Sequence, residues 1–503
     1  MSVSHFIWEK NMKRYFALIL AALLLMPTII SCSQNGSEET KGAETSSETA
    51  AAADSEVETE EETDDGNIRS WEGLTFDGAE INIVGRTEPT YAIDFYAEEI
   101  TGEAVNDAVY NRNSKVDNDL GVQLNYINGS DDYNTFFTNV RNSVSAADGA
   151  YDMVSSYAYF AAPLSLEKLF TNLHTVPNLA LTNSWYNQSF VNDMTVNGQL
   201  DFVIGDLTLT ATDRMIITFF NKDLAQKWIP DVNLYEDVYE GKWTIDYLAS
   251  LVSNVWEDKN GNGKIDPSDV FGLSYQIGSV PTDGMITALG VHMVDKDADG
   301  NLYINLYNEM SNTAFEKLIN LVYNTSGVGL SMNDAFKNAN VLFVMECANY
   351  AKYALRDFDP DYGVLPLPKL DEAQDGYRTT AQDAYDVISI PTTCKNLEAT
   401  GASLEYLSAL SQSDVYPAYF ETTFQKQYMR SEEDSVMFDL IKSGLEFNFG
   451  TFYSSCIGNP VWTFRDSISN NRSFTSEYKK MAKVYEKTLK KFTEAMAERA
   501  AAE

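Results

Sequence analysis

Between residues 80 and 154 the chain alternates regularly between strand-like and helix-like segments. Apolar residues recur at every second position in the strand-like segments and at helical spacing in the others. In chain order, these segments are residues 80–85, 106–120, 122–127, 131–147 and 151–154. Asn106 is expected to cap the first helix and Gly121 to end it. The order predicts a mainly parallel sheet covered by helices on both faces, with ligands bound beyond the carboxyl ends of its strands.

The rest of the body continues this α/β pattern without a transmembrane run or a clear short repeat. Further units are expected over 215–260, 313–345 and 396–450, and Asn197-Gly198 predicts a hairpin turn. Residues 476–503 carry apolar side chains at helical spacing, which predicts an amphipathic terminal helix packed on the body. We therefore expect two α/β lobes with several chain crossings between them.

The segment before residue 67 differs in kind from the body. Lys13-Arg14 precede an apolar run from Tyr15 to Ile30, which ends at Ser31-Cys32. The run is shorter than the roughly 20 residues that span a bilayer, and its basic start is typical of a signal peptide. Residues 29–32 resemble the lipobox of bacterial lipoproteins, which implies cleavage before Cys32 and attachment of a lipid to its sulfur. The alternative is a secretory signal with an incidental cysteine.

These features predict three segments. Residues 1–31 are expected to be a lipoprotein signal peptide, in which Met12 is a more ordinary start than Met1. Residues 32–66 are expected to be the lipidated cysteine and a disordered acidic tether, because residues 33–66 hold twelve Asp or Glu side chains against one Lys. Residues 67–503 are expected to be the folded body of two α/β lobes with several chain crossings.

Charge and composition exclude several functions. The chain has 36 basic and 74 acidic side chains and a net charge of −38, so it repels nucleic acid and anionic membrane surfaces. Three His residues argue against a His-rich metal centre, and four Cys residues argue against a disulfide scaffold. Cys347, Cys394 and Cys456 are expected to be buried thiols; a Cys394–Cys456 bridge has no supporting pattern. Common hydrolase, nucleotide-binding and zinc-protease motifs are absent from the sequence.

Several segments, in order along the body, resemble the extracellular solute-binding proteins of sugar-importing ABC transporters. They are 106–113 (NDAVYNRN), 149–154 (GAYDMV), 219–222 (FFNK), 241–246 (GKWTID) and 362–369 (YGVLPLPK). The resemblance implies an α/β, two-lobed periplasmic-binding-protein-like fold of type II, with interleaved lobes and a hinge. It also implies a monomer that captures a sugar or oligosaccharide and delivers it to ABC permease subunits. Its place would be the extracellular face of the cytoplasmic membrane, lipid-anchored, in a Gram-positive-type bacterium.

Two alternatives remain open at this stage. The solute could be a peptide, a polyamine or a polyol in place of a sugar. The chain could instead be a surface lipoprotein that degrades glycans, because 74 acidic residues make chance carboxylate pairs inevitable.

Candidate ligand-binding residues are aromatic, acidic and basic side chains near expected strand ends and crossings. Sugars pack a C–H face on an aromatic ring, and their hydroxyl groups need polar partners. The Ser184-Trp185-Tyr186 segment resembles a Trp-Trp pair of the family that can serve packing alone. The candidates are Arg86, Tyr91, Tyr157, Tyr159, Trp185, Asp206, Asp213, Glu346, Tyr350, Asp383, Tyr385 and Trp462.

Residues 258–269 match an EF-hand calcium loop. Oxygen-bearing side chains occupy positions 1, 3, 5, 9 and 12, Gly263 fits the turn at position 6, and a helix over 244–256 is expected to lead in. The expected ligands of a structural Ca²⁺ are Asp258, Asn260, Asn262, Lys264 (through its carbonyl oxygen), Asp266 and Asp269. The alternative is a metal-free turn built by Asn, Asp and Gly. Residues 295–300 look similar, but we interpret them as an Asp-Gly hairpin turn.

Overall fold

The computed structural model describes residues 66–278, 280–356, 358–425 and 431–502. Asp64–Glu503 form one compact unit. The predicted signal peptide, Cys32 and nearly all of the tether lie outside the described residues, so these predictions stay predictions. Within the described ranges, no helix is long and apolar enough to cross a membrane.

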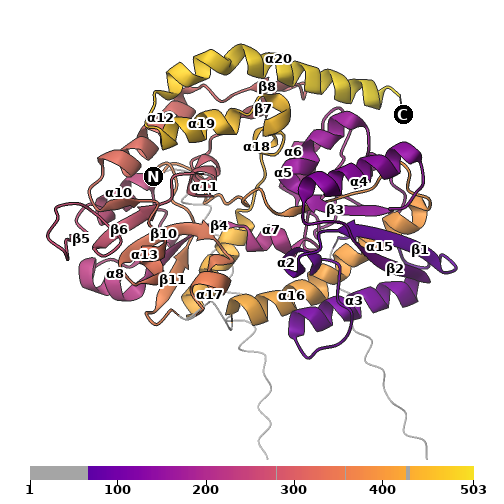
Figure 1. Ribbon diagram of the computed structural model, residues 1–503, viewed down its shortest axis with the longest axis horizontal. Coiled ribbons are helices and arrows are strands. Elements are labelled where there is room, and N and C mark those ends of the chain that lie inside the picture. The colour runs from indigo at the N-terminus through magenta and orange to yellow at the C-terminus, as the bar shows by residue number, and fades with distance from the viewer. Residues whose placement is uncertain (1–65, 279, 357, 426–430, 503) are drawn as a thin grey trace, which may run out of the picture. The chain divides into compact units, whose positions relative to one another are not determined.

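The first lobe is built on a four-stranded sheet in the order β12-β3-β1-β2. Its strands are β1 (Ala79–Gly85), β2 (Val122–Asn128), β3 (Met153–Tyr157) and β12 (Asp386–Ser389). β1 pairs in parallel with β2 and β3, and β12 runs antiparallel to β3. The connecting helices α3 (Ala104–Leu120) and α4 (Tyr133–Ala146) lie on opposite sides of the sheet (Figure 1). The predicted β-α-β-α-β order is confirmed.

The ends of α3 show what the sequence did and did not indicate. Gly121 ends the helix in the left-handed conformation with φ 59°, as expected. The N-cap is Glu103, whose carboxylate accepts a hydrogen bond from the backbone N–H of Asn106. The prediction of Asn106 as the cap is wrong, because the helix already begins at Ala104.

The second lobe contains a larger mixed sheet in the order β11-β4-β10-β6-β5, with β9 also paired to β6. Its strands are β4 (Ile216–Asn221), β5 (Trp256–Glu257), β6 (Val270–Tyr275), β9 (Val328–Leu330), β10 (Val341–Cys347) and β11 (Tyr362–Leu365). All residues of β4, β6 and β10 are buried, as expected for strands that are covered on both faces. The helices of this lobe include α8 (Lys222–Trp228), α9 (Leu234–Tyr239), α10 (Ile245–Val252), α11 (Val280–Ala288) and α12 (Glu309–Ile319).

The segments that cross between the lobes pair with one another. Isolated bridges join Val203 to Ile388, Met215 to Ala381 and Thr379 to Leu445. The first crossing, between Val203 and Met215, includes the short helix α7 (Leu209–Asp213). These paired segments are the natural place for relative motion of the lobes, which the sequence could not locate.

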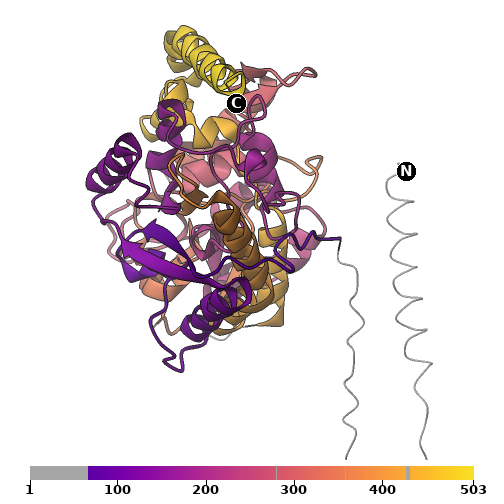
Figure 2. The same cartoon turned by 90° about the vertical axis from the view of Figure 1, so that its right-hand side faces the viewer.

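Late segments of the chain return to both lobes. The helices involved are α15 (Leu397–Leu410), α16 (Tyr416–Tyr419), α17 (Glu432–Ser443), α18 (Phe449–Phe452), α19 (Pro460–Ser469) and α20 (Phe474–Ala500). α15 contacts α3 and β1, although it comes much later in the chain. The paired strands β1 and β2 can be followed in both views (Figures 1 and 2). α20 contributes Tyr485 to the second-lobe core and Leu489 and Phe492 to the first. The predicted amphipathic terminal helix and the interleaved lobes are both confirmed.

The remaining turns and cysteines follow from local chemistry. Asn197 and Gly198 adopt positive φ values of 51° and 76° between Val196 and Gln199, which confirms the Asn-Gly turn. β7 (Val294–Lys296) and β8 (Leu302–Ile304) form the hairpin expected around residues 295–300. Cys394 and Cys456 are free thiols, so they form no bridge. The short helices α2 (Pro89–Ala92), α5 (Ala158–Ala161), α6 (Gln188–Met194), α13 (Asp334–Lys337) and α14 (Tyr350–Ala354) lie in the connections between these elements.

Candidate functional site

A cluster of charged and aromatic side chains lies where the first-lobe strands end and the crossings begin. We call it the junction cluster, and it comprises Arg86, Tyr91, Tyr157, Arg214, Asp283, Asp383, Asp386 and Arg465. Arg86 follows β1 directly, and its Nη2 lies 2.5 Å from Asp386 Oδ1 and donates to the Ala384 carbonyl at 2.8 Å. Its guanidinium carbon lies 3.2 Å from the centre of the Tyr91 ring. Arg86 therefore ties the end of β1 to the segment 379–385 that leads into β12, which we call the second crossing.

Tyr91 links Arg86 to the first crossing. Its hydroxyl accepts a hydrogen bond from Arg214 Nη2 at 2.8 Å, and Arg214 is the residue that ends α7. Since one face of the Tyr91 ring carries the Arg86 guanidinium, this tyrosine positions two arginines and offers that face to no ligand.

The second lobe reaches the junction through Arg465 of α19. Arg465 pairs with both carboxylate oxygens of Asp283 on α11, and its Nη2 lies 3.8 Å from Asp383. Asp383, on the second crossing, also accepts from the hydroxyl of Tyr157 at 3.5 Å. A continuous polar path thus connects β3 of the first lobe, a crossing segment and α19 of the second lobe.

Burial controls the ionisation of the acids in this region. Asp386 is fully buried, and desolvation raises its pKa to about 6 although Arg86 opposes the rise. The same cause, with repulsion from Asp386, raises the pKa of buried Asp94 well above its usual range. Asp94 accepts from the backbone and hydroxyl of Thr210 on the first crossing at 3.3 and 3.0 Å. These two acids therefore favour holding protons while both stay buried.

A second polar group follows β10 of the second lobe. The Glu346 carboxylate accepts from Asn333 Nδ2, and burial raises the pKa of Glu346. The Tyr350 hydroxyl donates to the Asn333 carbonyl at 3.3 Å, and the Tyr353 ring meets Tyr350 edge-on at 5.6 Å. The Tyr353 side chain is 64% exposed, which leaves an aromatic face open to a ligand.

The predicted ligand residues separate into groups. Arg86, Tyr91, Tyr157 and Asp383 belong to the junction cluster, and Tyr159, Asp383 and Tyr385 line one pocket beside it. Trp462 is 46% exposed and its ring lies 5.3 Å from the Arg465 guanidinium. Glu346 and Tyr350 belong to the polar group after β10. A role for these residues in ligand binding stays a prediction.

Trp185 and Asp206 lie elsewhere, whereas Asp213 immediately precedes Arg214 of the junction cluster. Trp185 is buried and its ring lies 5.7 Å from Trp71, which fits the packing alternative. Trp185 and Asp206 line a different pocket, where Gln412 donates to Asp206 at 2.9 Å. Asp213 is buried and accepts from the Tyr419 hydroxyl. None of these three contacts the junction cluster through a hydrogen bond or ion pair among the described residues.

The residues predicted from the sequence do not include Arg214, Asp283, Asp386 and Arg465. Each has its partner in a segment that is distant along the chain, as the pairs Arg214–Tyr91 and Arg465–Asp283 show. The available signal is the position of Arg214 and Asp386 beside expected crossings, which does not distinguish them from other charged residues.

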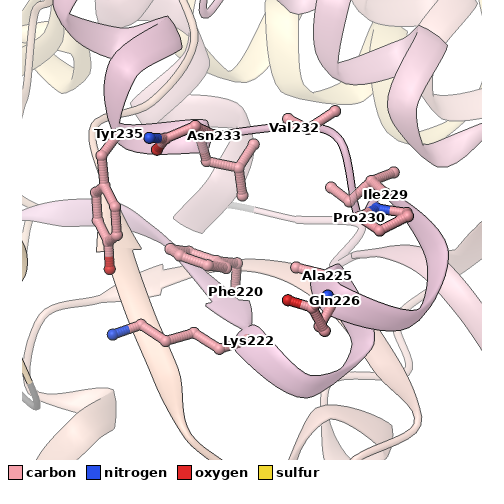
Figure 3. Close-up of a pocket in the computed structure, with 10 residues that line it drawn as sticks. Phe220, Lys222, Ala225, Gln226, Ile229, Pro230, Val232, Asn233 and Tyr235 are labelled. Atoms are coloured by element: carbon pink, nitrogen blue, oxygen red, sulfur yellow. The ribbon is translucent and has the colours of Figure 1, made fainter.

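Another pocket lies at the far end of β4, away from the crossings. Figure 3 shows the apolar side chains of Phe220, Ile229, Pro230 and Val232 around it, with Lys222 and Tyr235 at one side. Lys222 and Tyr235 both bond to Asp434, at 3.1 and 2.6 Å. Because Lys222 and Tyr235 are already paired with Asp434 and the pocket meets no crossing segment, it is a weaker candidate for solute capture than the junction.

The predicted calcium loop joins two strands, β5 and β6. The prediction of a helix over 244–256 is therefore wrong at its end, because α10 stops at Val252 and β5 covers Trp256–Glu257. Asp258 accepts from the backbone N–H groups of Gly261 and Gly263 at 2.6 and 2.7 Å. These two hydrogen bonds wrap the loop backbone around the Asp258 carboxylate.

The Asn side chains of the loop bond both to its backbone and to its carboxylates. The Nδ2 atoms of Asn260 and Asn262 donate to Asp266 Oδ2 at 2.6 and 2.7 Å, and turning each amide over would present its oxygen instead. Asp269 accepts from the backbone of Lys259 and Asp266 at 3.0 and 3.1 Å, so it closes the loop base. In this arrangement, no group of three or more His, Cys, Asp or Glu side chains among the described residues converges as a metal site. The donor set fits Ca²⁺ once the amides are turned, and its binding stays a prediction.

The two sheets, the paired crossings and the polar junction define the type II periplasmic-binding-protein fold. No protein-family model matches the chain, and no curated protein is similar to it in sequence. Solved structures do match.

The cyclic α-maltosyl-1,6-maltose binding protein of Arthrobacter globiformis is 12% identical, with a TM-score of 0.55 over 82% of this chain and 100% of that one. The galacto-N-biose/lacto-N-biose I-binding protein of the Bifidobacterium longum ABC transporter is 13% identical, with a TM-score of 0.54 over 83% and 98%. A family 1 extracellular solute-binding protein from Bifidobacterium longum subsp. infantis is 12% identical, with a TM-score of 0.52 over 82% and 99%. These neighbours are described as binding proteins, and at such identities the likeness shows the fold.

Proposed function

We propose that this protein captures a sugar or oligosaccharide outside the cell for an ABC importer. The observation that carries the proposal is the junction cluster, in which Tyr157, Asp383 and Arg465 connect the two lobes at their crossings. Carboxylate and guanidinium groups beside aromatic rings suit the hydroxyl groups and C–H faces of sugars. The likeness in fold to binding proteins for maltosides and lacto-N-biose supports the same class of ligand.

The mechanism is a shift in population between two arrangements of the lobes. A ligand that touches both lobes stabilises the arrangement in which both sets of contacts form at once. The paired crossings at Met215–Ala381 and Thr379–Leu445 are the segments that absorb the change. The bound arrangement is the one that permease subunits would accept.

The direct test is a thermal-shift screen of the chain without its signal peptide across mono- and oligosaccharides. A true ligand at 100 times its Kd adds about 2.7 kcal/mol of stability and raises the melting temperature. Asp383→Asn should weaken that response, whereas Asp206→Asn, in a different pocket, should leave it intact. A response only to peptides, polyamines or polyols would replace the sugar assignment, and release of sugar from a glycan would replace pure binding.

The proposal includes a lipid anchor at Cys32. The basic residues, apolar run and Ser31-Cys32 pattern support it, and the acidic segment that follows would serve as a tether. Expression in a Gram-positive host with a radiolabelled fatty acid should label the wild-type chain. Cys32→Ser should remove the label, and a labelled variant would contradict the assignment.

We also propose that residues 258–269 bind one structural Ca²⁺. The alternating oxygen donors and the loop turned around Asp258 support it, and extracellular calcium suits the Kd of roughly 10⁻⁴–10⁻³ M found in extracellular modules. Calcium added to chelator-treated protein should raise the melting temperature, while magnesium at equal concentration should do less. No response to calcium would leave the metal-free turn.

A further inference from the structure

Arg214 links the first crossing to Tyr91 of the junction cluster. It ends α7 on the first crossing, and its backbone carbonyl accepts from the N–H of Gln382 on the second crossing at 2.8 Å. Its charge influences the ionisation of Tyr157 in the first lobe, of Tyr353 in the second and of Asp383 on the crossing. A group bound to Arg214 would therefore lie within reach of both lobes.

The guanidinium of Arg214 has more N–H donors than the described part of the protein supplies acceptors for. It has five N–H donors, of which one at Nη2 bonds to the Tyr91 hydroxyl at 2.8 Å, and the Cys347 thiol at the end of β10 is a further, weak partner. No carboxylate of the described chain lies within 4.0 Å of it, whereas Arg86 and Arg465 each pair with an aspartate. The side chain is half-buried, and none of its nitrogens is both buried and unbonded. Its spare donors are thus accessible to a ligand.

The neighbouring carboxylates have other partners. Asp386 pairs with Arg86, and Asp213 accepts from the Tyr419 hydroxyl. Asp383 accepts from Tyr157 at 3.5 Å and from Gln382 Nε2 at 2.5 Å, and it faces Arg465 at 3.8 Å. Among the described residues, Arg214 therefore has no carboxylate of its own within ion-pair distance, and a ligand carboxylate would supply the negative group.

We propose that Arg214 binds a carboxylate of the ligand, so that the captured saccharide contains a uronic acid. A guanidinium matches a carboxylate through two parallel N–H···O bonds, which a neutral hydroxyl group cannot reproduce. Tyr91 holds the guanidinium in place, and the exposed ring of Tyr353 offers a face for the sugar. The inference rests on the proposed function, because it names the class of sugar for the same site.

The test uses matched pairs of ligands in calorimetric titrations of the chain without its signal peptide. Oligogalacturonate, oligomannuronate and glucuronic acid-bearing xylo-oligosaccharide are each compared with the neutral sugar made by reducing their carboxyl groups. The acidic member of one pair should bind about tenfold tighter or more, since a hydrogen bond to a charged group contributes on that order. Arg214→Gln should abolish the difference and Arg214→Lys should keep part of it. Arg141→Gln, at an exposed ion pair with Glu167, should keep all of it.

Salt dependence provides a readout that needs no variant. The affinity of the wild-type chain for the acidic sugar should fall as ionic strength rises, and the affinity for its neutral partner should not. Neutral sugars that bind as tightly as acidic ones, or an Arg214→Gln variant that weakens both equally, would overturn the uronic acid proposal and leave sugar capture standing. Absence of binding by any saccharide would overturn both.

Discussion

The junction cluster and the 258–269 loop both gather carboxylates, but they treat them in opposite ways. At the junction, burial raises the pKa of Asp386 to about 6. In the loop, hydrogen bonds from Ser268, with others from the Asn260 and Asn262 amides, lower the pKa of the partly exposed Asp266 to about 2. Desolvation therefore dominates where distant segments bury an acid, and local donors dominate where the acid stays in water. Aspartate side chains are thus buried structural groups in the junction cluster and ionised carboxylates in the 258–269 loop.

The largest loss of stability should come from removing the positive charge of Arg465 on α19, which pairs with buried Asp283. Arg465→Met leaves Asp283, which is 6% exposed, without its partner in the second-lobe core. Loss of one member of a buried pair costs about 3–5 kcal/mol, because the remaining charge stays desolvated. Urea denaturation followed by circular dichroism should show that loss as a lower midpoint.

The matched control is Arg141→Gln, which breaks an ion pair whose side chains are both about 40% exposed. An exposed pair contributes on the order of 0–1 kcal/mol. Equal losses for Arg465→Met and Arg141→Gln would mean that the junction charges are as well solvated as surface charges, and the contrast between the two regions would fail.

This contrast also explains what the sequence could predict. The alternation of strands and helices, the stop at Gly121 and the Asn-Gly turn at 197 depend on neighbours within a few residues, and the structure confirms them. The chelating pattern of 258–269 is local in the same sense. Such features are visible because their cause lies within one short segment.

The junction cluster could be predicted only in part. The sequence indicates Arg86 and Tyr157 because parallel strands place their carboxyl ends at one edge. It does not indicate Arg214 and Arg465, because their partners depend on how the crossings pair, which is a property of the tertiary fold. Asp206 shows the converse, since a plausible residue type chosen without that tertiary information lies in another pocket.

A second prediction concerns pH and the acids Asp94 and Asp386. Their pKa values are raised, so the folded chain holds protons that the unfolded chain, with carboxyl pKa values near 3.8, has released. Their contribution to stability is therefore greatest below about pH 4 and is lost as pH rises through 6, on the order of 1–3 kcal/mol for such a shift. Asp94→Asn should flatten this fall in urea denaturation at pH 4.5, 5.5, 6.5 and 7.5. An unchanged slope would show that Asp94 does not titrate in this range.

The third prediction separates the loop from the junction. One millimolar calcium should stabilise the wild-type chain by about 0.4–1.4 kcal/mol, given a Kd of roughly 0.1–1 mM. Asp266→Asn should lose most of this gain, because position 9 then has no charge to offer. Arg465→Met should keep the calcium response in full despite its lower stability, since the Arg465 guanidinium bonds to Asp283 on α11 and not to the loop. A response lost in both variants would mean that the two regions are energetically one.

The smallest expected effect is that of Lys264→Ala. Position 7 of such a loop supplies a backbone carbonyl, so the side chain is free to change, and removal of its positive charge can only help a cation to bind. Differential scanning calorimetry with and without calcium should therefore give the same stabilisation for Lys264→Ala and wild type, or a slightly larger one. If Lys264→Ala instead abolished the response as Asp266→Asn does, the stabilisation would not arise from a chelating loop, and the metal-free turn held by the Asn260 and Asn262 amides would be the better account of this region.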